Sequence, residues 1–285
     1  MPTKDKRTRK ESIPKCVDDL CLMDDIFLQV CVEKNLDAAN LLLRIILEHP
    51  ELTVKTMTVQ EDIKSLYSHS VRLDILATDD KGTKYNVEIQ RSDEGASEKR
   101  VRYYQGIIDI SSLPKGKSYN KLPDTYIIFV TENDIFGAGL PLYHVDEMIR
   151  ELGVPYKSGR HVIFANASYE EKAKASCDLS DIAKLMADFR EKDPDNMHFE
   201  ELSERAKYYK TDKGGKAKMN GIIAGLVRDC EREAEKRGEK RGEKRGETNA
   251  ILTALKKWGV EMTADTFGMT KDAVIALAKQ NGIAL

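Results

Sequence analysis

The sequence predicts a mixed α/β fold of the α+β kind, in which a mixed central β-sheet is flanked by helices and followed by a helical C-terminal appendage. Three observations predict it. Helical periodicity near the N-terminus gives way to three segments typical of strands, which are followed by a helix and two further strands. From about residue 179 onward the pattern is helical. This order of elements is typical of a sheet that helices cover.

Composition limits what the chain can be. Its 285 residues, of which 41% are hydrophobic and 33% charged, are enough for one sizeable core and an appendage. The net charge is −2, from 46 basic and 48 acidic residues, so any affinity for DNA must come from local patches or from a metal that bridges to phosphate. No apolar run approaches the roughly 20 residues that span a bilayer, and the N-terminus lacks the apolar stretch of a signal peptide. We therefore expect a cytoplasmic protein without membrane association.

Cysteine and histidine give no sign of a metal centre. The five cysteines contain no CxxC pair, so buried or free thiols are expected rather than a zinc site. The histidines at 144, 161 and 198 have no metal-ligand spacing and are expected to be structural or exposed. No small-molecule cofactor is predicted.

The N-terminal elements follow from capping and stop signals. Residues 1–20 form a basic tail, which is either a flexible end or a contact for phosphates. Asp24 or Asp25 caps a first helix, and a second helix runs from about residue 37 to 48 before Pro50 ends it. Strands are expected at 54–60, 71–78 and 84–90. A helix is expected at 97–110, followed by strands at 126–131 and 161–165.

The second and third of these strands form a hairpin that brings acidic residues together. If residues 80–82 are its loop, with Gly82 in the left-handed region, Asp79 pairs with Thr83. Counting back along both strands then places Asp74 opposite Glu88, with Cβ atoms roughly 4.5 to 5.5 Å apart. Gln90 shares the face of Glu88, because side chains alternate along a strand. Two carboxylates this close repel unless a proton or a cation lies between them, which indicates Mg²⁺ or Mn²⁺.

The hairpin and its surroundings resemble a known family. Asp74 followed by Glu88-Ile89-Gln90 is similar to the PD-(D/E)XK nuclease signature, in the variant of the nuclease-family transposases, also called recombination-promoting nucleases. In that variant the terminal Lys is commonly Gln. The resemblance extends over about residues 20 to 210, in five ordered blocks at 70–75, 84–91, 99–105, 126–134 and 139–143.

This resemblance implies a restriction-endonuclease-like core and a nuclease site. Asp74, Glu88 and Gln90 would be catalytic, with Asp74 and Glu88 as metal ligands and Glu33 as a possible third one from the first helix. On the following helix, Arg100 and Tyr104 are four residues apart and face the same way. Arg100 would reach a phosphate and Tyr104 would stack or donate a hydrogen bond; the alternative is a solvated Arg and a half-buried Tyr.

The C-terminal third has two parts. Residues 211–248 form a charged spacer that contains Glu-Lys-Arg-Gly three times, starting at Glu235, Glu239 and Glu243. It is expected to be marginally helical, because three glycines cost more than the weak Lys and Glu pairs contribute. Residues 249–285 form a small helical module with a break at Gly268 and a cap at Thr270. The module either enters a DNA groove or is a packing or dimerisation unit.

Three functions remain open from the sequence. The first is a Mg²⁺-dependent DNA endonuclease of residues 21–210, with a transposase or recombination-promoting role and a possible homodimer. The second is a binding protein on a catalytically weak or inactive nuclease fold. The third is a structural or interaction protein in which Asp74 and Glu88 are polar residues on a solvent-facing sheet. A lysine in place of Gln90 would orient the attacking water and add positive charge, which an amide cannot do.

Overall fold

The computed structural model of the chain describes residues 16–63, 71–91, 97–171 and 179–283. Most of the predicted basic tail, residues 1–15, lies outside this part. The chain divides into two compact units, one of Pro14–Asn220 and one that contains Gly221–Leu285. The division falls within the predicted spacer.

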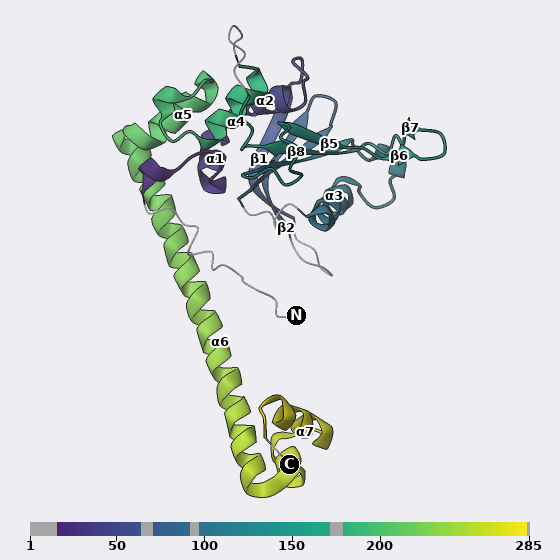
Figure 1. Cartoon of the computed structure of the whole chain (residues 1–285), viewed down its shortest axis with the longest axis vertical. Helices are drawn as coiled ribbons and strands as arrows, with labels where there is room; N and C mark the ends of the chain where they lie inside the picture. The colour runs from purple at the N-terminus through teal and green to yellow at the C-terminus, as the bar shows by residue number, and fades with distance from the viewer. Residues whose placement is uncertain (1–15, 64–70, 92–96, 172–178, 284–285) are drawn as a thin grey trace. The chain divides into compact units, whose positions relative to one another are not determined.

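The first unit begins and ends with helices, and its strands lie between them in two runs separated by α3 (Figure 1). Its strands form one six-stranded sheet in the order β1-β2-β3-β4-β8-β5, beside a separate two-stranded pair, β6-β7. In chain order the elements are η2 (Val17–Asp19), α1 (Asp25–Val32), α2 (Leu36–Ile46), β1 (Val54–Ile63), β2 (Val71–Asp79), β3 (Lys84–Gln90), α3 (Glu98–Ser112), η4 (Tyr119–Lys121), β4 (Thr125–Thr131), β5 (Leu142–Val145), β6 (Met148–Ile149), β7 (Val154–Pro155), β8 (Arg160–Asn166), α4 (Asp181–Arg190), η5 (Pro194–Asn196) and α5 (Glu200–Thr211).

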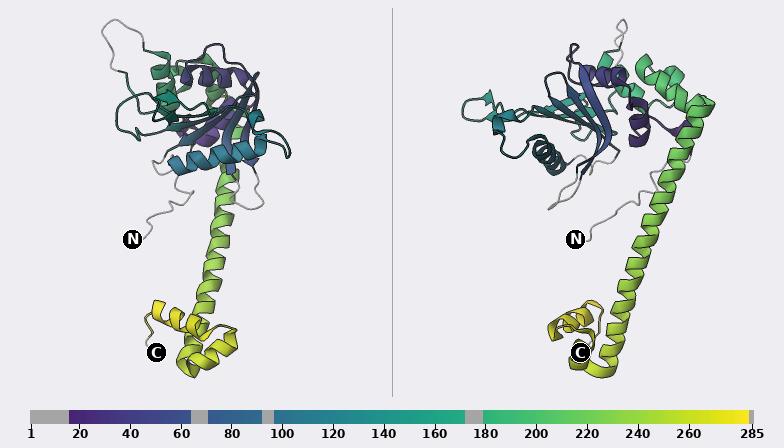
Figure 2. Two further views of the ribbon diagram at one scale, coloured as in Figure 1. Left: turned by 90° about the vertical axis from the view of Figure 1, so that its right-hand side faces the viewer. Right: turned by 180° about the vertical axis from the view of Figure 1, so that it is seen from behind.

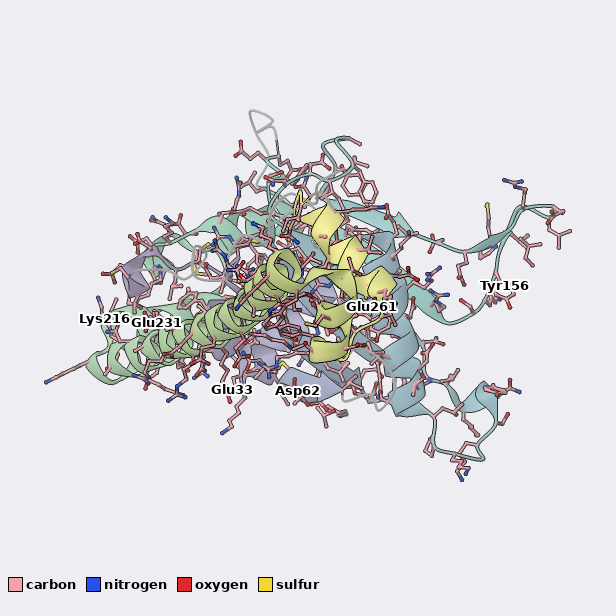
Figure 3. All side chains as sticks on the ribbon, turned by 90° about the horizontal axis from the view of Figure 1, so that it is seen from below. Glu33, Asp62, Tyr156, Lys216, Glu231 and Glu261 are labelled. Carbon is pink, nitrogen blue, oxygen red and sulfur yellow. The ribbon has the colours of Figure 1, made fainter. Side chains whose placement is uncertain are left out.

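The sheet is mixed, as the sequence predicts. Strands β1, β2 and β3 are antiparallel neighbours, β3, β4 and β8 run parallel, and β5 pairs antiparallel with β8. The sequence analysis did not predict β5, β6 and β7, because strands of two to four residues carry too little alternation to be recognised. Tyr156, which follows β7 in the segment between β5 and β8, is exposed (Figure 3).

Helix α3 covers the face of the sheet to which Glu88 belongs. Val101, Tyr104 and Ile108 of α3 share one buried cluster with Ile127 and Phe129 of β4. Phe129 is the register partner of Glu88 in the neighbouring strand, so the two side chains lie on the same face. The core beneath α3 therefore borders the predicted site.

The other face packs against α2. Leu42 and Leu43 of α2 line a small apolar cavity together with Ile75, Ala77 and Val87 of β2 and β3. Figure 2 shows α3 and the α2 side on opposite faces of the sheet. The central strands are thus covered on both faces, which explains why β3 is buried along most of its length.

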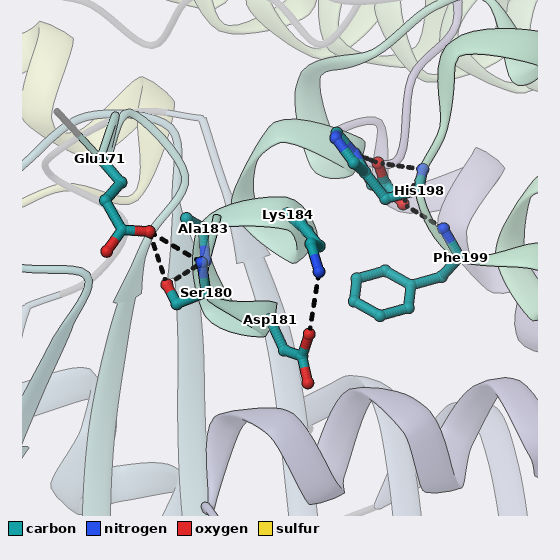
Figure 4. A network of polar contacts seen from close by, with 8 residues as sticks. Glu171, Ser180, Asp181, Ala183, Lys184, His198 and Phe199 are labelled. Atoms are coloured by element: carbon teal, nitrogen blue, oxygen red, sulfur yellow. Dashed lines mark hydrogen bonds and ion pairs between the residues drawn. The ribbon is translucent and has the colours of Figure 1, made fainter. Parts of the chain in front are cut away.

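Helices α4 and α5 extend the layer formed by α1 and α2, and their connection is held by polar contacts (Figure 4). Ser180 caps α4 by accepting from the backbone N–H of Ala183 at 3.4 Å. Asp188 is fully buried and accepts from the backbone N–H groups of His198 and Phe199. The ring of His198 also contacts Asp188, through Nδ1 at 2.8 Å. These contacts with Asp188 give His198 a structural role in the connection between α4 and α5.

The second unit begins within a long helix. Helix α6 (Lys213–Phe267) runs through all three Glu-Lys-Arg-Gly repeats and is interrupted at Gly259, whose φ is 77°. The spacer was expected to be only marginally helical; its Glu, Lys and Arg residues are good helix formers, and helices flank it on both sides, so the helix propagates through the glycines. Side chains over residues 235–247 are exposed. Among the described residues, no helix has the length and apolar character needed to cross a membrane.

After Gly259 the chain forms a small helical module (Figure 2). Leu255, Ala264, Val274 and Ala278 make its core, with the last two on α7 (Lys271–Gln280). The break predicted at Gly268 and the cap predicted at Thr270 are confirmed: Gly268 has a φ of 62°, and Thr270 Oγ1 accepts from the N–H of Ala273 at 3.2 Å. DNA contact by this module remains a prediction.

Candidate active site

The hairpin of β2 and β3 has the register that the sequence predicts. Ile75 pairs with Val87, so the next step along both strands places Asp74 opposite Glu88. At the turn, the N–H of Asp79 donates to the carbonyl of Thr83 at 3.1 Å. Gly82 has a φ of 87°, which a residue with a side chain rarely adopts. This turn therefore sets which acidic side chains meet.

Each carboxylate is held by the other strand. Glu88 is 1% exposed, and its Oε1 accepts from the backbone N–H of Asp74 at 3.2 Å and from Asn86 Nδ2 at 3.1 Å. In return, Asp74 Oδ2 accepts from the backbone N–H of Ile89 at 3.1 Å. This exchange fixes both groups in the plane between the strands and leaves Asp74 Oδ1 and Glu88 Oε2 for other partners.

Burial and mutual repulsion disfavour two negative charges here. Burial raises the pKa of Glu88, and the nearby Asp74 raises it further, while Arg100 and the hydrogen bonds from Asp74 and Asn86 oppose the change. Burial also raises the pKa of Asp74, and the N–H of Ile89 opposes it. The pair is therefore poised to hold a proton or to bind a cation.

A guanidinium from α3 lies beside the acids. Arg100 Nη2 is 3.5 Å from Glu88 Oε2, Nη1 donates to Gln90 Oε1 at 3.1 Å, and Nε donates to the hydroxyl of Tyr104 at 2.8 Å. The guanidinium also lies over the Tyr104 ring, 4.9 Å from its centroid. Burial is the main cause of a raised pKa of Tyr104. The structure thus brings Asp74, Glu88, Gln90, Arg100 and Tyr104 together.

Glu33 does not join them. It follows α1, and its backbone carbonyl accepts from Arg205 at 2.9 Å. Within residues 16–63, 71–91, 97–171 and 179–283, no three His, Cys, Asp or Glu side chains come together as a metal site would require. The third position near Asp74 is occupied by an amide instead: Gln29 Nε2, from α1, donates to Asp74 Oδ1 at 3.4 Å.

A second amide stands behind the first. Gln60 Nε2, from β1, donates to Gln29 Oε1 at 2.7 Å. Gln29 could have been recognised in the sequence, since it is the one polar residue in the run Ile26-Phe-Leu-Gln-Val-Cys-Val32. Asn86 also carried a signal, because it lies two residues before Glu88 on the same face. Gln60 carried none, because its role depends on the register of β1 with β2.

Two buried amides have side-chain atoms without a hydrogen-bond partner. Within the described part of the chain, Asn86 Oδ1 and both side-chain polar atoms of Gln105 are buried without a hydrogen bond. Gln105 follows Tyr104 on α3 and is 1% exposed. Unsatisfied polar atoms of this kind are costly, and they cluster at functional sites or bind ordered water.

One of three comparisons with known proteins found a match. Residues 30–150 match the family of PD-(D/E)XK nuclease family transposases. No curated protein and no solved structure gave a significant match. The matched segment contains the acidic hairpin, Gln90 and the Arg100 and Tyr104 pair of α3, and it ends before β8. The nuclease-family segment is thus the part of the chain that carries the candidate site, and it confirms the resemblance found in the sequence.

Proposed function

We propose that the protein is a metal-dependent DNA endonuclease that hydrolyses phosphodiester bonds in a transposase or recombination-promoting role. The observation that carries the proposal is the pair of a half-buried Asp74 and a buried Glu88, which the register of β2 and β3 sets opposite each other within residues 30–150. Nuclease membership implies a nucleic-acid substrate. A pair of acids held apart by backbone hydrogen bonds at this position supports metal-assisted chemistry.

The donor set fits Mg²⁺ or Mn²⁺. Both ions prefer oxygen ligands, and Mg²⁺ is commonly bound by one or two carboxylates, with waters and substrate phosphate completing the shell. Asp74 and Glu88 supply two hard oxygen donors, and a cation between them would offset the cost of charging two groups whose pKa values burial raises. When bound, the ion would polarise the phosphoryl oxygen and lower the pKa of a water ligand.

The chain's own residues would then bind and orient the phosphate. Arg100, whose side chain is 34% exposed, would donate hydrogen bonds to a phosphate oxygen while it keeps its contact with Tyr104. Gln90 cannot carry charge or move a proton, so in our proposal the positive charge next to this position comes from Arg100. Gln90 would hold Arg100 and orient a water by hydrogen bonding.

Supercoiled plasmid nicking tests the proposal. Wild type with Mg²⁺ or Mn²⁺ is compared with Asp74→Asn and Glu88→Gln, which keep the shape of each side chain. A matched control is Asp80→Asn, in the turn of the same hairpin. Both site variants are expected to lose at least about a hundredfold in rate, and the control to cleave like wild type. Metal-dependent cleavage that survives both site substitutions would contradict the site assignment.

A second candidate is a nuclease-fold protein that binds metal and DNA but turns over slowly or not at all. The amide at Gln90 favours it, because the site then has no lysine at the position after Glu88. Calorimetric binding of Mn²⁺ without plasmid nicking would support this alternative. In that case Gln90→Lys is expected to raise cleavage, because it supplies the cation that the amide lacks.

A further inference from the structure

A relay of two amides ends on Asp74. Gln29 is 5% exposed on α1, donates through Nε2 to Asp74 Oδ1 at 3.4 Å and accepts through Oε1 from Gln60 Nε2 at 2.7 Å. Because an amide has distinct donor and acceptor ends, the bond from Gln60 fixes which end of Gln29 faces the carboxylate. The relay therefore orients a donor toward the one oxygen of Asp74 that the β3 backbone does not hold.

Gln60 occupies an unusual backbone position for this purpose. The register of β1 with β2 pairs Val59 with Ile75 and Glu61 with Leu73, which places Gln60 directly across from Asp74. Gln60 has a φ of 53°, within a strand, where a residue with a side chain is rarely found. Such backbone strain persists only where the surroundings enforce it, and it gathers at functional sites.

We propose that Gln29 and Gln60 are positioning residues for metal binding at the Asp74 and Glu88 pair. The inference rests on the proposed function of that pair. The relay holds the Asp74 carboxylate in one rotamer, so that Oδ1 and Glu88 Oε2 are presented together to a divalent cation. The strained conformation of Gln60 directs its amide toward Gln29. Groups that orient a metal ligand in this way change metal affinity by about 10- to 100-fold when they are removed.

Strain and function predict opposite effects of one substitution. Gln60→Gly removes the amide but also relieves the positive φ, which glycine adopts without cost. It is therefore expected to leave the melting temperature equal to or above that of wild type while weakening metal binding. A purely structural Gln60 would show no such separation of stability from affinity.

A second strained residue provides the matched control. Glu48, between α2 and β1, has a φ of 51° and is exposed, and its backbone N–H donates to the carbonyl of Ile45. Glu48→Gly relieves the same kind of strain outside the relay. It is expected to change stability in the same direction as Gln60→Gly and to leave metal affinity unchanged.

The test measures Mn²⁺ binding by calorimetry and melting by circular dichroism on the full-length protein. The variants are Gln29→Leu, Gln60→Gly, Glu48→Gly and Asp74→Asn. We expect the dissociation constant to rise about tenfold or more in Gln29→Leu and Gln60→Gly, to stay unchanged in Glu48→Gly, and binding to be lost in Asp74→Asn.

The outcomes separate the two proposals. Wild-type affinity in both folded relay variants, with loss in Asp74→Asn, would overturn the relay and leave the metal site standing. Absence of Mn²⁺ binding by wild type would overturn the metal site and the relay together. If Gln29→Leu is unfolded, Gln60→Gly decides alone, because its folded state is relieved of strain.

Discussion

In the absence of metal, Glu88→Gln should be more stable than wild type, and the difference should grow as the pH rises. The folded state raises the pKa of both Glu88 and Asp74, so at neutral pH it retains a proton that the unfolded chain has released. Under that condition the free energy of unfolding falls as the pH increases. A glutamine in place of Glu88 removes one of the two charges and hence most of this loss.

The magnitude follows from the contacts of Glu88. Each unit by which the pKa is raised corresponds to about 1.4 kcal/mol of destabilisation once the pH exceeds the folded-state value. Against this gain, the substitution loses the ion pair with Arg100, which is long at 3.5 Å and reaches a guanidinium that is 34% exposed, and so contributes about 1 kcal/mol or less. Oε1 of the glutamine can keep the hydrogen bonds from Asp74 N–H and Asn86. The net expected gain is about 1 to 3 kcal/mol at pH 8 and near zero at pH 5.

Urea denaturation in EDTA, at pH 5 and at pH 8, measures this difference. Trp258 is the one tryptophan of the chain and belongs to the C-terminal unit, so its fluorescence reports on that unit. Circular dichroism and calorimetry report on the sheet instead, and a gain of this size corresponds to a rise in melting temperature of about 2 to 4 °C per kcal/mol. Added Mg²⁺ should stabilise wild type at pH 8 and not the variant. Equal pH dependence in both proteins would refute the claim that Glu88 is destabilising without metal.

Three further outcomes are expected. Arg100→Gln should reduce plasmid nicking by about 10²- to 10³-fold, because Arg100 contacts Glu88 and Gln90 in the candidate site, while Arg102→Gln, at an exposed position of the same helix, should leave it unchanged. Lys210→Met should lower the free energy of unfolding by about 2 to 4 kcal/mol, because the buried Nζ of Lys210 donates to the carbonyls of Asp18, Leu20 and Lys192. Lys207→Met, at an exposed ion pair, should change it by less than about 1 kcal/mol, and denaturation curves compare the two variants. Thr270→Ala should lower the stability of the C-terminal module by about 1 kcal/mol, seen as a shift in Trp258 fluorescence during melting, and an unshifted curve would show that the cap contributes nothing.

The sequence predicted those features that depend on local geometry. The loop at Gly82 and the alternation of β3 are short-range properties, so counting residues was enough to place Asp74 opposite Glu88. The four-residue spacing on α3 likewise placed Arg100 beside Tyr104. The mixed sheet followed from the order of its elements.

Features that depend on distant segments were not predicted. Gln29 and Gln60 lie 45 and 14 residues before Asp74, and their meeting depends on how α1 and β1 pack around the hairpin. The resemblance suggested Glu33 as a third metal ligand. Glu33 is the residue directly after α1, and its backbone carbonyl accepts a hydrogen bond from Arg205. Gln29 lies within α1, whereas Glu33 is the non-helical residue that ends it, so the helical alignment of residues four apart does not extend to Glu33.

The candidate site contains several features that reduce stability, and one explanation covers them. The opposed carboxylates of Asp74 and Glu88, the strained backbone of Gln60 and the unsatisfied Asn86 Oδ1 all reduce stability in the absence of a ligand. A cation between Asp74 and Glu88 would remove the repulsion between the two carboxylates. The fold thus maintains a costly arrangement whose compensation comes from what binds there, which is what a preformed site for metal and phosphate requires.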